Sequence, residues 1–210
     1  MDYKFIDILF YCFSYLVGSL SFAIIVSKLM NIEDPRSYGS QNAGATNVMR
    51  SGNKFAGFLT FFGDFAKGFI VVILAKLFFR HDLNFEQILA ISSTLVIIGH
   101  IFPVFFKFKG GIGVATAIGV FLGIYYIVGL YFVVVWFIIY KLFKVSSLAA
   151  IVALIVTPVY AFFYFGDSLR FGAILIISII VLAKHRTNIL RLFVGKEHKF
   201  SSHQDGNNGK

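Results

Sequence analysis

The chain has 210 residues, of which 58% are hydrophobic and only 14% are charged. Soluble domains usually have about a quarter of their residues charged, so this composition excludes an ordinary soluble domain. The net charge of +9 could suit a nucleic acid, but the cations flank apolar segments and form no basic, aromatic groove. We therefore expect a membrane protein whose environment is the lipid bilayer and which binds no nucleic acid.

Six apolar segments follow one another along the sequence, separated by polar stretches. They are the runs 5–26, 55–79, 88–106, 114–143, 148–165 and 171–183. Cys12 is the single cysteine, so the chain cannot form an intramolecular disulfide. We expect one polytopic membrane domain over residues 1–200. The remaining segment 201–210 has no apolar side chains and is predicted to be disordered.

The run 114–143 is too long for a simple span, because 30 helical residues extend about 45 Å and the hydrocarbon core is about 30 Å thick. It is either one tilted helix or two shorter helices with a turn between Gly123 and Gly129. Two helices would place the cationic loops 27–54 and 107–113 on the same side as the cationic tail, which the positive-inside rule favours. The sequence thus predicts an all-α integral membrane protein with seven transmembrane helices, the N-terminus outside and the C-terminus in the cytoplasm.

The first polar cluster, residues 34–50, is punctuated by Gly and Pro and is predicted to be a loop. Its hydroxyls, amides and two arginines suit a phosphate or a polyol. A solvated loop that caps neighbouring helices is the alternative interpretation.

Two further polar clusters lie on the same predicted side, at residues 99–116 and 185–197. A glycine-rich turn at 110–113 that opens a helix would offer backbone N–H groups to an anion. It could equally be a tight turn between two spans. In the last cluster, His185 could be a base or a phosphate ligand, or a residue that only caps the end of a helix.

Ionisable residues also occur inside the apolar runs. Asp64 and Lys67 are three residues apart and would share one helix face, so we expect them to form a structural ion pair. We expect His100 to have a structural role, with hydrogen bonds inside the helix bundle.

Taken together, the three clusters resemble a known family, the bacterial acyl-phosphate:glycerol-3-phosphate acyltransferases called PlsY. The resemblance covers residues 8–200 and rests on ordered motifs. These are Tyr-Leu-Val-Gly-Ser at 15–19, Gly-Ser-Gln-Asn-Ala-Gly-Ala-Thr-Asn-Val-Met-Arg at 39–50, Gly-His-Ile-Phe-Pro-Val-Phe-Phe at 99–106, Phe-Lys-Gly-Gly-Ile-Gly-Val-Ala-Thr at 108–116, and His-Arg-Thr-Asn-Ile-Leu-Arg-Leu with Gly-Lys-Glu at 185–197.

The resemblance implies a first step of phospholipid synthesis at the bacterial inner membrane, with the active site facing the cytoplasm. An acyl group passes from acyl phosphate to the sn-1 hydroxyl of glycerol 3-phosphate, giving lysophosphatidic acid and phosphate without a metal or cofactor. A soluble partner, PlsX, makes the acyl phosphate. The implied catalytic residues are His185, Asn188, Ser40 and Arg50. The implied substrate-binding residues are Asn42, Thr46, Asn47, Lys109, Gly110, Gly111, Ile112 and Gly113.

Two positions depart from the family pattern. Ile112 stands where the family has a lysine expected to bind phosphate, and Gln41 replaces the usual glycine after Ser40. Losing a charge-assisted hydrogen bond of about 1.5–3 kcal/mol predicts a site that is roughly 10- to 150-fold weaker unless another cation replaces the lysine. An impaired homologue that binds lipid phosphates and a small-anion transporter are the alternative functions. A transporter should have broken helices near the midplane in a repeated pattern, and no repeat is visible here.

Overall fold

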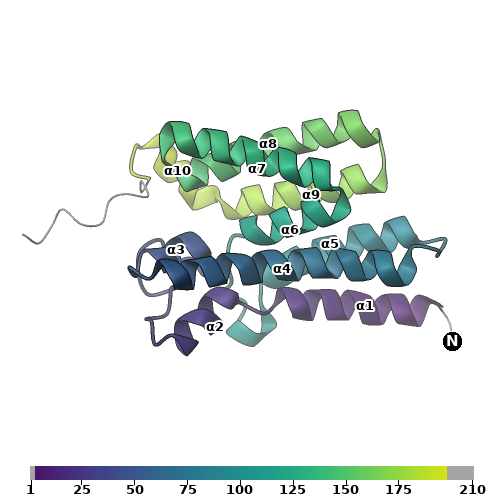
Figure 1. Cartoon of the computed structure of the whole chain (residues 1–210), viewed down its shortest axis with the longest axis horizontal. Helices are drawn as coiled ribbons and strands as arrows, with labels where there is room; N and C mark the ends of the chain where they lie inside the picture. Colours follow the sequence, from purple (N-terminus) through teal and green to yellow (C-terminus); the bar gives the residue numbers. More distant parts are fainter. Residues whose placement is uncertain (1–2, 198–210) are drawn as a thin grey trace, which may run out of the picture.

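The computed structural model describes residues 3–197, and all regular secondary structure in this range is helical (Figure 1). The helices are α1 (Tyr3–Gly18), α2 (Phe22–Leu29), α3 (Ala45–Met49), α4 (Lys54–Phe79), α5 (Phe85–Ile101), the 3₁₀ helix η1 (Val104–Phe106), α6 (Val114–Ile124), α7 (Tyr126–Phe143), α8 (Ser146–Phe165), α9 (Leu169–Lys184) and α10 (Arg186–Phe193). The segment 201–210 lies outside the described residues.

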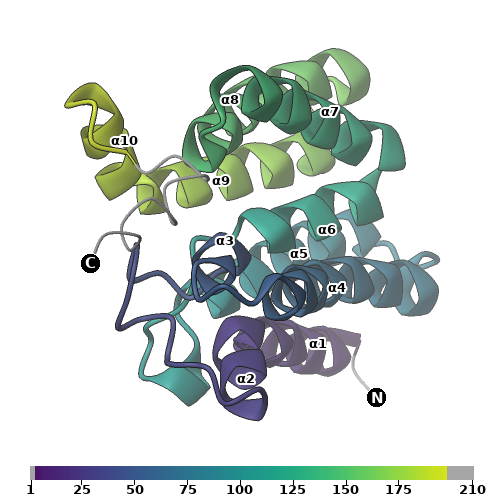
Figure 2. The ribbon, with the colours of Figure 1, turned by 60° about the vertical axis from the view of Figure 1, so that its left-hand side comes forward.

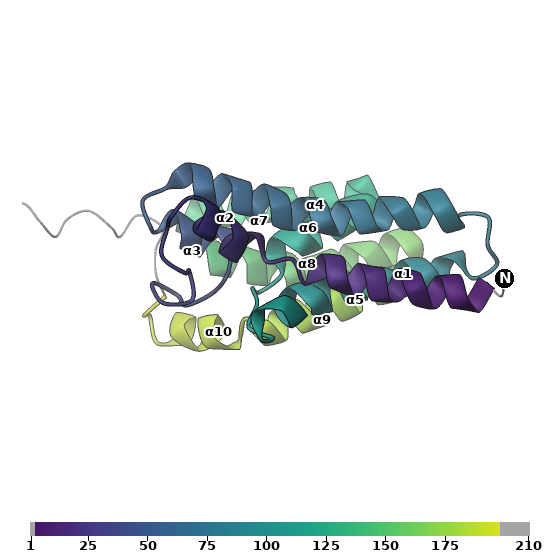
Figure 3. The same ribbon diagram turned by 90° about the horizontal axis from the view of Figure 1, so that it is seen from below.

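The helices form two groups with α6 between them. Figure 2 shows α1, α2, α4 and α5 on one side and α7, α8 and α9 on the other. The short elements α2, α3 and α10 lie at one end of the bundle, whereas α1 begins at the other end (Figures 1 and 3). The arrangement therefore brings the first and last polar clusters to the same end.

Within residues 3–197, four helices are long and apolar enough to cross a membrane, or up to six segments if each bent pair counts as one span. The bent pairs are α1 with α2, at 46°, and α9 with α10, at 59°. Helix α6 has only 11 residues and is about 16 Å long, which is shorter than a hydrocarbon core. Length and composition thus support a multi-pass protein and do not by themselves give seven spans.

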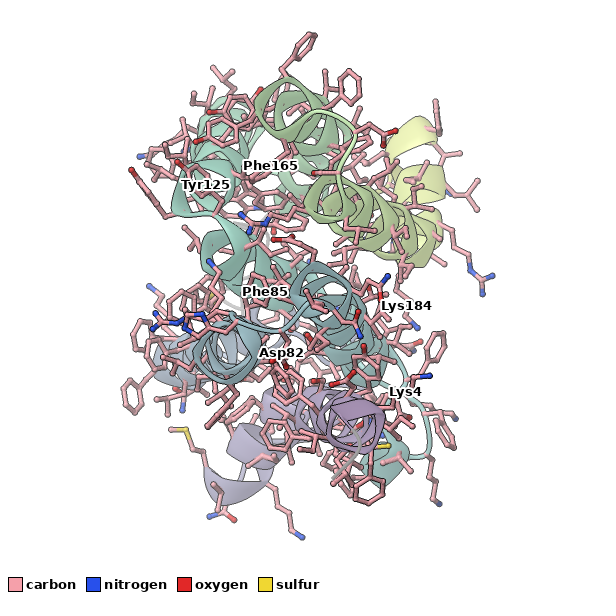
Figure 4. The ribbon with its side chains drawn as sticks, turned by 90° about the vertical axis from the view of Figure 1, so that its right-hand side faces the viewer. Lys4, Asp82, Phe85, Tyr125, Phe165 and Lys184 are labelled. Carbon is pink, nitrogen blue, oxygen red and sulfur yellow. The ribbon has the colours of Figure 1, made fainter. Side chains whose placement is uncertain are left out.

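The structure confirms that the run 114–143 is two helices. The chain turns at Tyr125, whose backbone is extended with φ −155° and ψ 119°. Figure 4 shows Tyr125 and Phe165 near each other at the end of the molecule where α1 begins, and their rings pack edge to face with 5.7 Å between the ring centroids. The turn falls inside the interval between Gly123 and Gly129 that the sequence indicated.

Close packing of α6 on α4 holds the start of α6 in place. At Gly68 a Cβ would collide with the carbonyl oxygen of Thr116, and at Gly119 it would collide with the carbonyl oxygen of Phe65. Small residues of this kind let helix backbones approach closely in membranes. A larger side chain at either glycine would push the two helices apart.

The first apolar run, 5–26, is long enough for one continuous helix, but the structure divides it into two helices. It breaks between Gly18 and Phe22, and the Nζ of Lys67 donates a 2.7 Å hydrogen bond to the carbonyl of Leu20 inside the break. Because a backbone carbonyl left unpaired in a membrane protein is costly, this long-range contact stabilises the bend.

Candidate active site

A cavity of about 470 Å³ lies where α3, α6, α7, α8 and α10 converge. All three polar clusters contribute to its wall. The residues from the sequence-based site that line it are Ser40, Asn42, Thr46, Asn47, Arg50, Ile112, Gly113, His185 and Asn188. Segments far apart in the sequence therefore form one site.

Asn47 organises the first polar loop. Its Nδ2 donates to the carbonyls of Pro35 at 2.5 Å, Asn42 at 3.1 Å and Tyr38 at 3.2 Å, and its Oδ1 accepts the backbone N–H of Ser40 at 2.9 Å. The side chain is only 2% exposed. Its polar atoms are thus committed to the loop, and Asn47 positions Ser40 at the cavity.

Ser40 and Arg50 present polar atoms to the cavity. Among residues 3–197, no side chain or carbonyl forms a hydrogen bond or ion pair with the Ser40 hydroxyl or the Arg50 guanidinium. Burial lowers the pKa of Arg50, while the nearby Glu197 carboxylate raises it. An arginine remains charged under these conditions, so Arg50 offers a cation with free donors.

The N–H groups in the first half of the predicted glycine turn are already occupied. The N–H of Gly110 donates to the Ile101 carbonyl and the N–H of Gly111 to the His100 carbonyl, both at 3.2 Å. Neither glycine lines the cavity, and Lys109 is exposed and does not line it either. These three residues, which were expected to bind substrate, therefore do not belong to the wall of this cavity.

The second half of the predicted turn and the start of α6 do line the cavity. Ile112, Gly113, Val114 and Ala115 all line the cavity. Gly113 has φ +107°, a backbone conformation that side chains rarely adopt, so glycine is required at this helix start. The first N–H groups of a helix have no partner inside it, and together with the helix dipole they favour an anion. The local electrostatics thus suit a phosphate even though Ile112 carries no charge.

His185 lies at the bend between α9 and α10. Its Nδ1–H donates to the Val181 carbonyl at 2.8 Å, so in the neutral ring Nε2 is the acceptor. Burial lowers the pKa of His185, opposed by that hydrogen bond and by the charge of Glu197. No partner for Nε2 occurs within the described part of the chain. His185 is therefore oriented to accept a proton or a hydrogen bond at the cavity.

Glu197 is a site residue that the sequence reasoning did not assign. Its carboxylate accepts hydrogen bonds from Asn188 Nδ2 at 2.8 Å, Arg191 Nε at 2.9 Å and Ser147 Oγ at 2.9 Å. It also lines the cavity. Glu197 thereby joins α10 to the start of α8 and fixes the amide of Asn188. Its presence in the motif Gly-Lys-Glu was the only available signal.

The expected pair of Asp64 and Lys67 is confirmed, with 2.9 Å between Oδ1 and Nζ. His100 joins them through Nδ1, 3.5 Å from the same oxygen. All three side chains are buried, and Asp64 and His100 reach the cavity wall. The His100 ring also packs against Gly111, where no Cβ would fit. This network thus connects α4 and α5 to the turn that precedes α6.

Apolar side chains form the rest of the wall. They come mainly from α6 and α7, with additions from α4 and α8, and they are Phe61, Val114, Ala115, Ile118, Val133, Trp136, Phe137 and Ala150. Within the described residues there is no group of three or more His, Cys, Asp or Glu side chains that could hold a metal ion. The cavity therefore combines anion-binding groups with an apolar surface.

The fold and the cavity define a class: a multi-pass membrane protein with a cavity that combines anion-binding groups and an apolar wall. Comparison with known proteins agrees. A family described as glycerol-3-phosphate acyltransferase matches residues 8–195. A glycerol-3-phosphate acyltransferase of Chromobacterium violaceum is 49% identical over 194 residues, covering 91% of this chain and 94% of the relative. One from Neisseria meningitidis is 48% identical over 186 residues, covering 89% and 93%.

Solved structures are similar as well. The crystal structure of PlsY, an integral membrane glycerol 3-phosphate acyltransferase, in its glycerol 3-phosphate form has a TM-score of 0.86 and 38% identity, covering 93% of this chain and 96% of that one. Its lysophosphatidic acid form has a TM-score of 0.83 and 37% identity, covering 92% and 94%. The chain belongs to the glycerol-3-phosphate acyltransferase family, PlsY.

Proposed function

We propose that this membrane glycerol-3-phosphate acyltransferase takes its acyl group from acyl phosphate and transfers it to the sn-1 hydroxyl of glycerol 3-phosphate. The hydroxyl oxygen attacks the acyl carbonyl carbon, an ester C–O bond forms, and the C–O bond to phosphate breaks. The products are lysophosphatidic acid and inorganic phosphate. The donor is a mixed anhydride, so its carbonyl is already activated and needs neither a metal nor a covalent enzyme intermediate.

One observation carries this proposal: unpaired anion-binding groups and an apolar wall meet in one cavity. Arg50, Ser40 and the start of α6 suit the phosphates, and the side chains of α7 suit the acyl chain. Holding two substrates in reactive alignment can lower a barrier by roughly 7–11 kcal/mol. Positioning the two substrates can therefore supply most of the rate enhancement.

The resemblance implies the residue roles, and the geometry of the cavity supports them. Arg50, Ser40 and Asn188 would hold glycerol 3-phosphate, with Asn188 oriented by Glu197. The Nε2 of His185 would orient the attacking hydroxyl or take its proton, and the leaving phosphate could take that proton instead. Asn42 and Thr46 would shape the first loop around the substrate, while Asn47 sets the position of Ser40.

A donor comparison tests the proposal. Purified protein in lipid vesicles receives glycerol 3-phosphate with either palmitoyl phosphate or palmitoyl-CoA, and lysophosphatidic acid is measured by mass spectrometry. We expect product from palmitoyl phosphate only. Product from palmitoyl-CoA at an equal rate would overturn the donor assignment while leaving the acyltransferase assignment intact.

An impaired homologue that binds lipid phosphates is the second candidate, and one observation favours it. Among the described residues, Arg50 is the single Lys or Arg side chain that lines the cavity, since Ile112 replaces the family lysine. Binding of glycerol 3-phosphate without any turnover, in protein that is folded, would support this candidate.

We also propose seven crossings, with the N-terminus outside and the cavity facing the cytoplasm of a bacterial inner membrane. The start of α1 and helix α10 lie at opposite ends of the bundle, which requires an odd number of crossings (Figure 1). Helix α6 would then be a short crossing. In spheroplasts, an impermeant maleimide should label Asp167→Cys and spare Lys196→Cys. The reverse pattern would invert the topology.

With the cavity on that side, PlsX could deliver acyl phosphate directly from the cytoplasm. Addition of PlsX with its own substrates should then support lysophosphatidic acid synthesis without added acyl phosphate. Failure of the coupled assay, with both enzymes active separately, would argue against such delivery.

A further inference from the structure

A second cavity, of about 510 Å³, lies at the end of the molecule opposite α3 and α10, between the first half of α1 and the end of α4. Figure 4 views this end and labels Asp82 beside it. Six apolar and two acidic residues line it: Ile6, Asp7, Leu9, Phe10, Phe13, Phe78, Phe79 and Asp82. None of them belongs to the proposed active site.

The two carboxylates are unusual because the structure gives them no ion-pair or hydrogen-bond partner among the described residues. Asp7 is only 9% exposed and faces this cavity from α1, while Asp82 approaches it from the turn after α4. Within residues 3–197, neither carboxylate forms an ion pair or accepts a hydrogen bond, although Lys4 and Arg80 are close in sequence. A buried acidic group in a membrane protein is costly unless a partner compensates it. A cation held in this cavity would compensate the charge of Asp7, with the half-buried Asp82 close to it.

The aromatic walls favour an organic cation. Phe10 and Phe79 are buried at the inner side, with ring centroids 5.0 Å apart, and Phe10 also stacks on Phe13 at 5.9 Å. Ring faces attract ammonium groups, most strongly where water is excluded. A metal ion is not supported, because the described residues contain no group of three or more potential ligands.

The outer rim of the cavity is open to hydrocarbon. Leu9, Phe13 and Phe78 are 51%, 41% and 71% exposed. In a bilayer these side chains would face lipid tails close to the headgroup level. An occupant could thus place its ammonium group between the two carboxylates and its chain along the rim.

We propose that this second cavity binds a membrane lipid with a primary ammonium headgroup, such as phosphatidylethanolamine, in the leaflet opposite the proposed active site. Asp7 and Asp82 would pair with the ammonium group, and the four phenylalanine rings would enclose its carbon atoms. The proposal does not depend on the acyl donor or on turnover.

Native mass spectrometry of the purified full chain tests the site, with phosphatidylethanolamine and phosphatidylglycerol of identical acyl chains as probes. We expect the ethanolamine lipid to bind at least tenfold more tightly to one site. The double variant with Asp7→Asn and Asp82→Asn should lose this preference, whereas Asp167→Asn, in another turn at the same end, should retain it. Equal affinity of the two lipids for the unmodified protein would overturn the proposal.

A change in the lipid itself covers the case in which the acidic variants fail to fold. N-acetylation of phosphatidylethanolamine removes the positive charge and keeps the chains and phosphate. The acetylated lipid should bind the unmodified protein no better than phosphatidylglycerol. Retained tight binding would show that the cavity recognises hydrocarbon alone, and the proposal would be wrong.

Discussion

The change Ile112→Lys should strengthen substrate binding. Ile112 lines the cavity immediately before α6, where it packs partly against the apolar core. Arg50 is the one Lys or Arg side chain that the described residues bring to this wall. An ammonium group at position 112 would add a charge-assisted hydrogen bond to a bound phosphate, which contributes about 1.5–3 kcal/mol.

One opposing effect reduces this gain in binding free energy. A cation near a helix N-terminus is disfavoured by about 0.3–1 kcal/mol. The net improvement should therefore be about 0.5–2.7 kcal/mol, or roughly 2- to 100-fold in affinity. The side chain of Lys is long enough to keep its charge in the cavity while its methylene groups replace the isoleucine contacts.

The assay is the KM for glycerol 3-phosphate and for palmitoyl phosphate in lipid vesicles. The matched control is Ile112→Met, which has similar length and no charge. We expect a lower KM for at least one substrate in the lysine variant alone. Equal KM values in the two variants would refute the inference that the start of α6 contacts a substrate phosphate.

Three further changes test other parts of the site. Arg50→Gln should lower kcat/KM by roughly 10- to 150-fold by removing the unpaired guanidinium, whereas Arg80→Gln, at the opposite end, should have no effect in the same kinetic assay. Because burial lowers the pKa of His185, its Nε2 should stay unprotonated below the pH at which free histidine gains a proton. Plotted against pH, kcat/KM should therefore hold through about pH 6.5, where free histidine is half protonated, and fall only further below it. His185→Gln should lose this limb, and an unchanged profile in that variant would exclude His185 as the group that titrates. Lys67→Met should destabilise the protein by about 3–5 kcal/mol in denaturant unfolding because it leaves Asp64 buried without its cation, and adding Asp64→Asn should recover part of the loss; a stable single variant would contradict that pairing.

The helical class and the break in the long apolar run could be predicted from sequence, because both depend on local features. The length of 114–143 exceeds one span, and its glycines fall where the turn at Tyr125 occurs. The break in the first run could not be predicted in this way. Its stabilising contact comes from Lys67, which is 47 residues away from Leu20.

In the candidate site, too, the features that depend on local sequence could be predicted, and those that depend on long-range contacts could not. Motif residues such as Arg50 and His185 indeed meet at one cavity. Sequence alone could not show that the N–H groups of Gly110 and Gly111 are already occupied by carbonyls from the end of α5. It also could not show that Glu197 holds Asn188, since that contact depends on the bend between α9 and α10 and on the return of the chain to α8.

The central claim is that this cavity transfers an acyl group from acyl phosphate to glycerol 3-phosphate. The most direct measurement follows lysophosphatidic acid and inorganic phosphate together, in one reaction of the purified chain in lipid with palmitoyl phosphate and glycerol 3-phosphate. We predict that the two products appear in equal amounts and that both depend on glycerol 3-phosphate. Phosphate release without lysophosphatidic acid would contradict the account. So would the absence of turnover in both the unmodified chain and the Ile112→Lys variant when both proteins are folded.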